Sequence, residues 1–206
     1  MTPGHPPATR GRLIALEGGE GSGKSTQAAI LAGSLGAVLA REPGGTASGE
    51  RIRALLLDPE FADLRPRAEV LLMLAARAQH VDEVIAPALA SGRDVVCDRF
   101  SASTVAYQGH GRGLDPSELA RLSTWASEGV EPDRVVLLQV TATIAAARRA
   151  GRTGHDRIEG EGAEFFSRVE EGFAALAAGD PARWRVVDGA GSVEEVAARV
   201  LAAARA

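Results

Sequence analysis

One stretch near the amino terminus constrains the fold of this chain more than any other. Residues 18–26 read Gly-Gly-Glu-Gly-Ser-Gly-Lys-Ser-Thr; they follow an apolar run, Leu13–Leu16, and precede a helical pattern. A strand, a glycine-rich turn and then Gly-Lys-Ser are the signature of a phosphate-binding loop. The alternative is a plain turn between strand and helix, but the complete signature in this context favours nucleotide binding.

The chemistry of the loop explains its residue types. Gly18, Gly21 and Gly23 allow the backbone to curl so tightly that successive N–H groups point at a phosphate. Lys24 can reach the outer phosphates, and the Ser25 hydroxyl can hold Mg²⁺. We therefore expect a nucleoside triphosphate to bind to the whole loop, which consists of Gly18, Gly19, Glu20, Gly21, Ser22, Gly23, Lys24, Ser25 and Thr26.

Composition narrows the class of protein. The chain has 206 residues, 45% hydrophobic and 24% charged, which suffice for one well-buried domain. A net charge of −4 gives no general attraction to nucleic acid or to an anionic membrane. The single cysteine, Cys97, excludes an internal disulfide. Because we find no membrane-spanning run and no signal-peptide core, we expect a cytoplasmic protein.

Five short apolar runs predict buried parallel strands. They are Arg12–Glu17, Ala37–Arg41, Asp94–Asp98, Arg134–Val140 and Trp184–Asp188. Helical patterns lie between them, at Gln27–Leu35, Gly49–Leu57, Ala68–Ala90, Asp115–Glu128, Thr141–Ala150, Ala163–Ala178 and Val193–Ala204. This alternation predicts an α/β fold, a five-stranded parallel sheet flanked by helices on both faces. We expect one domain over residues 12–206, preceded by a flexible tail over residues 1–11.

Ligands of open α/β sheets bind beyond the carboxyl ends of the strands, so the residues there are candidate site residues. Asp98 ends the third run, where a carboxylate serves Mg²⁺, unless it only caps a helix or faces solvent. Arg99 can fork onto the phosphate of an acceptor, or else form a surface ion pair. Arg41 ends the second run, and Pro43 with the glycines after it favours a turn that a ligand can approach closely.

Two further features carry positive charge. Arg77 falls on the apolar stripe of the helix expected at 68–90, so its side chain either extends to the rim or is aimed at a polar ligand. Residues 148–157 are basic and punctuated by glycines. They form either a solvated loop or a flap whose arginines close over the transferred phosphoryl group. The phosphate-binding loop has no cation besides Lys24, and phosphoryl transfer needs more positive charge, which favours the flap.

Taken together, these residues resemble those of bacterial thymidylate kinases. The resemblance covers nearly the whole chain from Leu13 onward and rests on an ordered set of motifs. The motifs are Glu17–Thr26, Arg41–Thr46, Ala75–Gln79, Asp98–Phe100, Ser103–Gly109 and Asp156–Glu159. The resemblance implies a P-loop nucleoside-monophosphate-kinase fold and transfer of the γ-phosphoryl group of Mg·ATP to dTMP, giving dTDP and ADP in dTTP biosynthesis. It also implies a homodimer that binds neither nucleic acid nor membrane.

The resemblance sorts the candidate residues by role. We expect the cations Lys24, Arg99, Arg148 and Arg152 to be catalytic. We expect Ser25 and Asp98 to bind Mg²⁺. We expect dTMP to be bound by Glu20, Arg41, Pro43, Met73, Arg77, Arg99, Thr104, Tyr107 and Gln108.

Several of these roles are specific to parts of dTMP. The resemblance implies that Glu20 meets the sugar and that Tyr107 packs on the deoxyribose, where it would crowd a 2′-hydroxyl. Arg77 would hydrogen-bond thymine, with Thr104 and Gln108 along the base edge. Met73 replaces the phenylalanine that often stacks on thymine in this family, and a thioether can still pack on a ring. Arg148, Arg152 and Arg157 would belong to a basic lid over about residues 148–160.

Rival functions make different demands. A kinase for another monophosphate would share the phosphate-binding loop. A deoxynucleoside kinase would need a base to activate a 5′-hydroxyl, and Glu42 is the only plausible carboxylate for it. A GTP-dependent switch would read guanine with an Asn-Lys-x-Asp motif, and the chain contains no asparagine. That last function is therefore excluded in its usual form.

Overall fold

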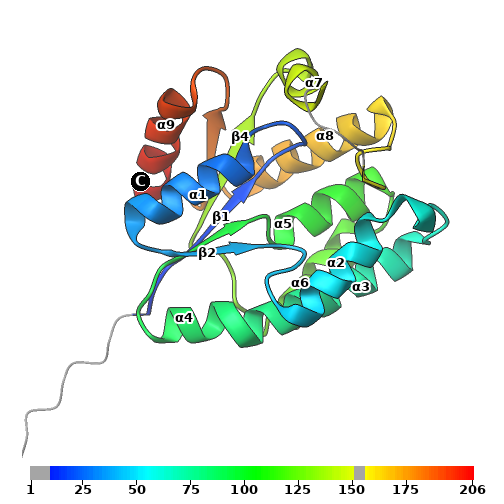
Figure 1. Ribbon diagram of the computed structural model, residues 1–206, viewed down its shortest axis with the longest axis horizontal. Coiled ribbons are helices and arrows are strands. Elements are labelled where there is room, and N and C mark those ends of the chain that lie inside the picture. Colours follow the sequence, from blue (N-terminus) through cyan, green and yellow to red (C-terminus); the bar gives the residue numbers. More distant parts are fainter. Residues whose placement is uncertain (1–9, 151–155) are drawn as a thin grey trace, which may run out of the picture.

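The computed structural model describes residues 10–150 and 156–206, and within them the strands form one parallel sheet (Figure 1). The strands are β1 (Leu13–Glu17), β2 (Val38–Arg41), β3 (Val95–Asp98), β4 (Arg134–Gln139) and β5 (Trp184–Asp188). Their order in the sheet is β2-β3-β1-β4-β5. The five predicted strands are confirmed, each to within one residue at either end, so the strand carrying the phosphate-binding loop lies at the centre.

The helices follow the predicted order. They are α1 (Lys24–Leu35), α2 (Ala47–Leu57), α3 (Pro66–His80), α4 (Ala86–Ala90), α5 (Ser101–Thr104), α6 (Pro116–Ala126), α7 (Ala142–Ala150), α8 (Ala163–Gly179) and α9 (Val193–Arg205). A 3-10 turn, η1 (Pro59–Phe61), follows α2. The π-helical turn η2 (Val81–Ile85) joins α3 to α4, so the long helix expected at 68–90 is confirmed.

One helical segment was not expected. Helix α5 continues into a second π-helical stretch, η3 (Val105–Gly111), directly after β3. Its sequence contains the β-branched residues Thr104 and Val105 and two glycines, Gly109 and Gly111, which are poor helix formers. Tertiary contacts decide the conformation instead, because η3 packs against α6 and α8.

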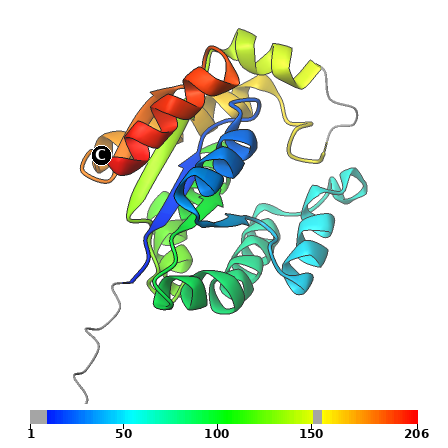
Figure 2. The ribbon, with the colours of Figure 1, turned by 60° about the vertical axis from the view of Figure 1, so that its left-hand side comes forward.

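The two faces of the sheet bury different helices. Because successive strand residues alternate sides, Ile14 and Leu16 face α1 and α9, whose Leu31 and Val200 complete that half of the core. Helices α1 and α9 lie side by side on this face (Figure 2).

The other face, with Leu13 and Ala15, packs against Phe100, Ile85 from η2 and Phe173 from α8. The two cores therefore hold the sheet in the middle layer, as the alternation of strands and helices predicted.

Two residues of the predicted flexible tail contact the rest of the fold. Residues 1–9 of the predicted tail lie outside the described residues, but Arg10 and Gly11, which we had included in it, are held in place. Arg10 forms an ion pair with Asp133 at 2.9 Å, and the Gly11 amide donates to the Leu89 carbonyl at 2.9 Å. Among the described helices, none combines the length and the apolar character that crossing a bilayer requires.

Candidate active site

The phosphate-binding loop has the geometry that its glycines predict. The loop leaves β1 after Glu17 and enters α1 at Lys24, with φ angles of 143° at Gly18, 78° at Gly21 and 95° at Gly23. Residues other than glycine rarely adopt such values. A Cβ atom on Gly21 would also lie only 2.6 Å from the Ala145 carbonyl oxygen. The tight turn therefore requires glycine here for both its conformation and its packing.

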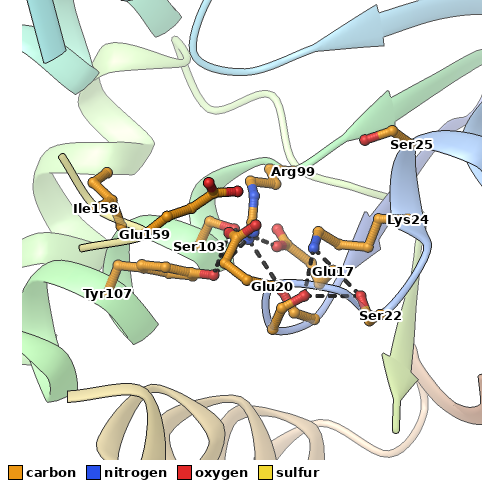
Figure 3. Close-up of polar contacts among 12 residues, drawn as sticks. Glu17, Glu20, Ser22, Lys24, Ser25, Arg99, Ser103, Tyr107, Ile158 and Glu159 are labelled. Carbon is orange, nitrogen blue, oxygen red and sulfur yellow. Dashed lines mark hydrogen bonds and ion pairs between the residues drawn. The ribbon is translucent and has the colours of Figure 1, made fainter. Parts of the chain in front are cut away.

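Lys24 is almost completely buried and folds back onto the loop. Its Nζ donates to the Gly19 carbonyl at 2.7 Å and to the Ser22 hydroxyl at 3.3 Å (Figure 3). Burial, with the nearby positive charge of Arg99, lowers the pKa of Lys24 to about 8. Because the charge of this buried ammonium group is poorly solvated, an anion that enters the loop would stabilise it strongly.

Ser25 and Asp98 come together as a candidate Mg²⁺ site. The strand register pairs Leu16 of β1 with Asp98, which places Asp98 beside the loop. The Ser25 hydroxyl donates to Oδ2 of Asp98. The other oxygen, Oδ1, is buried and has no hydrogen-bond partner within the described residues. A carboxylate and a hydroxyl are oxygen ligands that suit Mg²⁺, so these two residues fit the ion.

Arg99 lies at the centre of a second polar cluster. Its backbone is left-handed, with φ at 68°, and its guanidinium forms an ion pair with Glu20. The same guanidinium donates to the Tyr107 hydroxyl at 2.9 Å and lies over the Tyr107 ring, 4.8 Å from its centroid. The Tyr107 hydroxyl in turn donates to Glu20 at 2.9 Å. Figure 3 shows these side chains converging near Lys24.

Glu17 of β1 is hydrogen-bonded to residues next to this cluster, a role that the sequence analysis did not predict. Its carboxylate is completely buried and accepts from the Phe100 amide at 2.9 Å and from the Ser103 hydroxyl at 2.6 Å. Ser103 also accepts a hydrogen bond from Arg99 at 3.0 Å. Burial raises the pKa of Glu17 to about 7, although the Ser103 hydrogen bond and the charge of Arg99 oppose the shift. Glu17 thus holds Phe100 and Ser103 in place, and Ser103 in turn accepts from the Arg99 side chain.

Arg77 is in the cleft and not at the rim. Only 3% of it is exposed, and its Nε donates to Glu42 at 2.7 Å. Its other two nitrogens donate to Thr104 at 3.0 Å and Ser123 at 3.2 Å. The second oxygen of Glu42 faces His80, 3.3 Å from Nδ1. The buried cation is therefore paired and held in one orientation.

A single cleft, here called the main cleft, joins these groups. It is lined by every residue predicted to bind dTMP: Glu20, Arg41, Pro43, Met73, Arg77, Arg99, Thr104, Tyr107 and Gln108. Lys24, Ser25 and Asp98 line it as well. The main cleft thus places a triphosphate-binding loop and a set of polar groups suited to an acceptor along one continuous surface.

Arg53 of α2 is a cation of the main cleft that the sequence analysis missed. Its guanidinium donates to the Pro43 carbonyl at 3.0 Å, and burial together with the charge of Arg41 lowers its pKa. Arg41 itself pairs with Glu50 at 2.7 Å. The only signal for Arg53 was its position in the helix after the Arg41–Thr46 motif, and that position does not reveal which face meets the cleft.

The predicted lid arginines divide into different environments. Arg148 lies over the phosphate-binding loop and donates to the Ser22 carbonyl at 3.1 Å and the Gly189 carbonyl at 2.9 Å. Arg152 lies outside the described residues. Arg157 differs from the expectation for a lid, because it is buried and forms an ion pair with Glu69 at 2.6 Å. Its charge is already neutralised, so it is an anchor and not a cation facing a substrate.

Comparisons with known proteins agree with this geometry. Residues 16–200 match the family model for thymidylate kinase. The chain is 48% identical over 202 residues to a thymidylate kinase from Pelotomaculum thermopropionicum, covering 95% of this chain and 93% of that one. It is 50% identical over 195 residues to a thymidylate kinase from Synechococcus sp. (strain JA-3-3Ab), covering 91% and 92%. The crystal structure of thymidylate kinase from Ehrlichia chaffeensis has a TM-score of 0.77 at 32% identity, covering 94% and 98%.

Proposed function

The chain belongs to the thymidylate kinase family, and we propose that its main cleft carries the transfer of the γ-phosphoryl group of Mg·ATP to dTMP, giving dTDP and ADP. One observation carries the assignment of residues: the phosphate-binding loop and the Arg77 pocket open into the same cleft. A donor in the loop and an acceptor against Arg77 would therefore share one reaction space.

The chemistry needs positioning and positive charge more than it needs a base. The nucleophile is an oxygen of the dTMP phosphate, which is already ionised at pH 7. The oxygen attacks the γ-phosphorus, and the bond to the leaving ADP oxygen breaks. Lys24 and Arg99 stand where the main cleft meets the loop, so they would offset the charge that spreads over the moving group.

Further charge would come from the lid and from the metal. Arg148 contacts backbone carbonyls on the loop and forms no ion pair with a described carboxylate, so its charge is available to the nucleotide. We propose the same role for Arg152 on the resemblance alone. Mg²⁺ bound with ATP supplies additional positive charge to the phosphates. Ser25 and Asp98 would hold it, which would use the buried Asp98 oxygen that lacks a partner.

The acceptor half of the cleft suits each part of dTMP. Arg41, Arg53 and Arg99 provide cations for its phosphate. Arg77, fixed by Glu42, offers hydrogen-bond donors for the base, and Thr104 and Gln108 lie beside it. Tyr107 and Glu20 would meet the sugar, and Pro43 and Met73 supply apolar surface.

A deoxynucleoside kinase is less well supported. That reaction needs a carboxylate free to take the proton of a 5′-hydroxyl. Both oxygens of Glu42 already have partners, Arg77 and His80. Glu42 is therefore held in the wall of the cleft by two side chains and offers a hydroxyl no oxygen without a partner.

We further propose that the enzyme is a cytoplasmic homodimer of single-domain chains that binds neither nucleic acid nor membrane. Trp125 and Leu71 support the dimer, because they are the most exposed large apolar side chains of the described residues, at 78% and 66%. They stand on α6 and α3, which pack together. Exposed apolar surface of this kind commonly marks a protein interface.

The proposal is tested by measuring ADP release from Mg·ATP with purified protein. The acceptors dTMP, dUMP, UMP, CMP, GMP, AMP and thymidine are offered separately. We expect strong turnover with dTMP, weaker turnover with dUMP and little with the others. Preference for another monophosphate would overturn the roles given to Arg77, Thr104 and Tyr107, and preference for thymidine would restore Glu42 as a base.

A further inference from the structure

Glu69 is a buried carboxylate that the proposed reaction does not use directly. It lies on α3, is 1% exposed and is not among the residues that line the main cleft. Two side chains donate to it, Gln108 through Nε2 at 2.7 Å and Arg112 at 3.2 Å, and Arg157 forms an ion pair with it at 2.6 Å. It therefore collects two positive charges and one neutral amide behind the cleft wall.

These neighbours keep Glu69 ionised. Burial alone would raise its pKa, but the hydrogen bond from Gln108 and the charges of Arg112 and Arg157 outweigh burial and lower the pKa. An ionised carboxylate only accepts hydrogen bonds. Whatever donates to it must therefore present an N–H or O–H, and an amide can do so only with its NH₂ end.

This requirement decides which end of Gln108 faces the substrate. Gln108 lines the main cleft with Arg77, Thr104 and Met73. With Nε2 turned to Glu69, Oε1 is the end left for the cleft. No hydrogen bond to this oxygen is formed by any residue that the structure describes, so it is available to a ligand. The wall beside Arg77 consequently offers one oriented acceptor.

We propose that Glu69 is a specificity-determining residue: by fixing the amide of Gln108, it makes the cleft select a pyrimidine that carries a proton on N3. This inference rests on the proposed function, because it assumes that the base lies against Gln108. Thymine and uracil have an N3–H group, whereas N3 of cytosine is an acceptor. Cytosine would set its N3 lone pair against the Gln108 oxygen and its amino group against the donors of Arg77.

The expected discrimination is substantial. A site built to receive a substrate N–H group rejects the analogue that lacks it, because buried polar groups are then left unpaired. The arrangement would not distinguish thymine from uracil, which share the N3–H group. Glu69 therefore acts through Gln108 as a positioning residue and does not itself contact the base.

The test compares kcat/KM for dTMP with kcat/KM for dCMP. Glu69→Gln can either donate or accept, so it frees the Gln108 amide to turn over. We expect the dTMP-to-dCMP ratio to fall about tenfold or more. Gln108→Met, which removes the acceptor, should lower the ratio similarly. The double variant, which carries both Glu69→Gln and Gln108→Met, should have a ratio within about twofold of that of Gln108→Met alone.

Glu161→Gln is the matched control. Glu161 is the other carboxylate paired with Arg112, but it does not contact Gln108. Its loss should leave the ratio within about twofold of the wild-type value. The inference would be overturned if Glu69→Gln kept the wild-type ratio. It would also be overturned if Glu69→Gln lowered the ratio in the Gln108→Met background by as much as it does in the wild-type protein. A wild-type enzyme inactive with dTMP would instead overturn the proposed function.

A second measurement needs no change at Glu69 and applies even if Glu69→Gln fails to fold. In wild-type protein with ¹⁵N-labelled glutamine, the Gln108 side-chain NH₂ signals are identified by their absence in Gln108→Met. We expect these protons to exchange slowly with water in the free protein. We expect dTMP to leave that exchange rate unchanged. Rapid exchange that slows only when dTMP binds would show that the NH₂ end faces the base.

Discussion

Glu42 and Arg77 meet at 2.7 Å in the wall of the main cleft, although they lie 35 residues apart in the sequence. Glu42 comes from the loop after β2, and Arg77 comes from α3, so the ion pair ties the acceptor pocket to the edge of the sheet. Both side chains are buried, and each would be costly to bury alone. The orientation of Arg77 in the main cleft thus depends on Glu42.

Glu42→Gln should separate positioning from catalysis. We expect the KM for dTMP to rise about tenfold with kcat largely retained, because Arg77 loses its fixed orientation. The free energy of unfolding should fall by about 3 kcal/mol, since removing one partner leaves a buried charge uncompensated. Steady-state kinetics and denaturant unfolding measure both effects. Loss of kcat at unchanged KM would instead identify Glu42 as a base.

Lys24→Ala should abolish most turnover without removing the acceptor site. We expect kcat to fall by about 100-fold or more, because the moving phosphoryl group loses its nearest cation. Binding of dTMP, measured by calorimetry, should stay close to that of the wild type. Near-normal turnover would show that Lys24 has no role in the transfer.

The lowered pKa of Lys24 should be visible in the pH profile. In the free enzyme Lys24 loses its proton around pH 8, so kcat/KM for ATP should decline above that pH. A bound triphosphate favours the ammonium form, so the decline in kcat should begin at a higher pH. Lys24→Arg, which stays charged, should lack the decline. The same profile in both proteins would assign it to another group.

Glu17 should make the protein less stable as pH rises. The pKa of Glu17 is about 7 in the folded chain against an ordinary value of 4.5, so the folded state binds more protons between these pH values. Stability therefore falls as pH rises through this window, by up to about 3 kcal/mol from this group. Denaturant unfolding between pH 5 and 8 should show a shallower decline in Glu17→Gln. Parallel curves for the two proteins would contradict the shifted pKa.

Tyr107 allows the ring and the hydroxyl to be tested separately. Tyr107→Ala removes the ring that would crowd a 2′-hydroxyl, so activity with UMP should rise about tenfold relative to dUMP. Tyr107→Phe keeps the ring and loses only the hydrogen bonds to Glu20 and Arg99, so it should retain the preference for the deoxynucleotide. An unchanged preference in Tyr107→Ala would place the sugar elsewhere.

The sequence predicted the sheet well because its signals are local. Each strand is a short apolar run, and the helix predicted to begin at Asp115 is α6, where Asp115 accepts a hydrogen bond from the Ser117 amide at 2.8 Å. The stretch Ser101–Gly111 escaped prediction because its helical conformation depends on packing against α6 and α8 and not on its own residues.

The position of a residue in the main cleft was predictable where that residue stands at the end of a strand. Asp98 and Arg99 were found in this way, and both line the main cleft. Glu17 and Glu69 were not found, because their roles lie in pairings with residues far along the chain. Arg157 shows the converse error: a basic residue in a basic segment suggested a lid, yet Glu69 neutralises it.

The strand order β2-β3-β1-β4-β5 places the two halves of the site on opposite flanks of the sheet. Arg41 and Arg99, which would receive the acceptor, follow β2 and β3, whereas Arg148 and Gly189, which lie against the loop, follow β4 and β5. The central strand carries what both halves share. Substitutions on the flank of β2 and β3 should therefore alter the proposed acceptor site and leave the proposed donor site on the other flank unchanged.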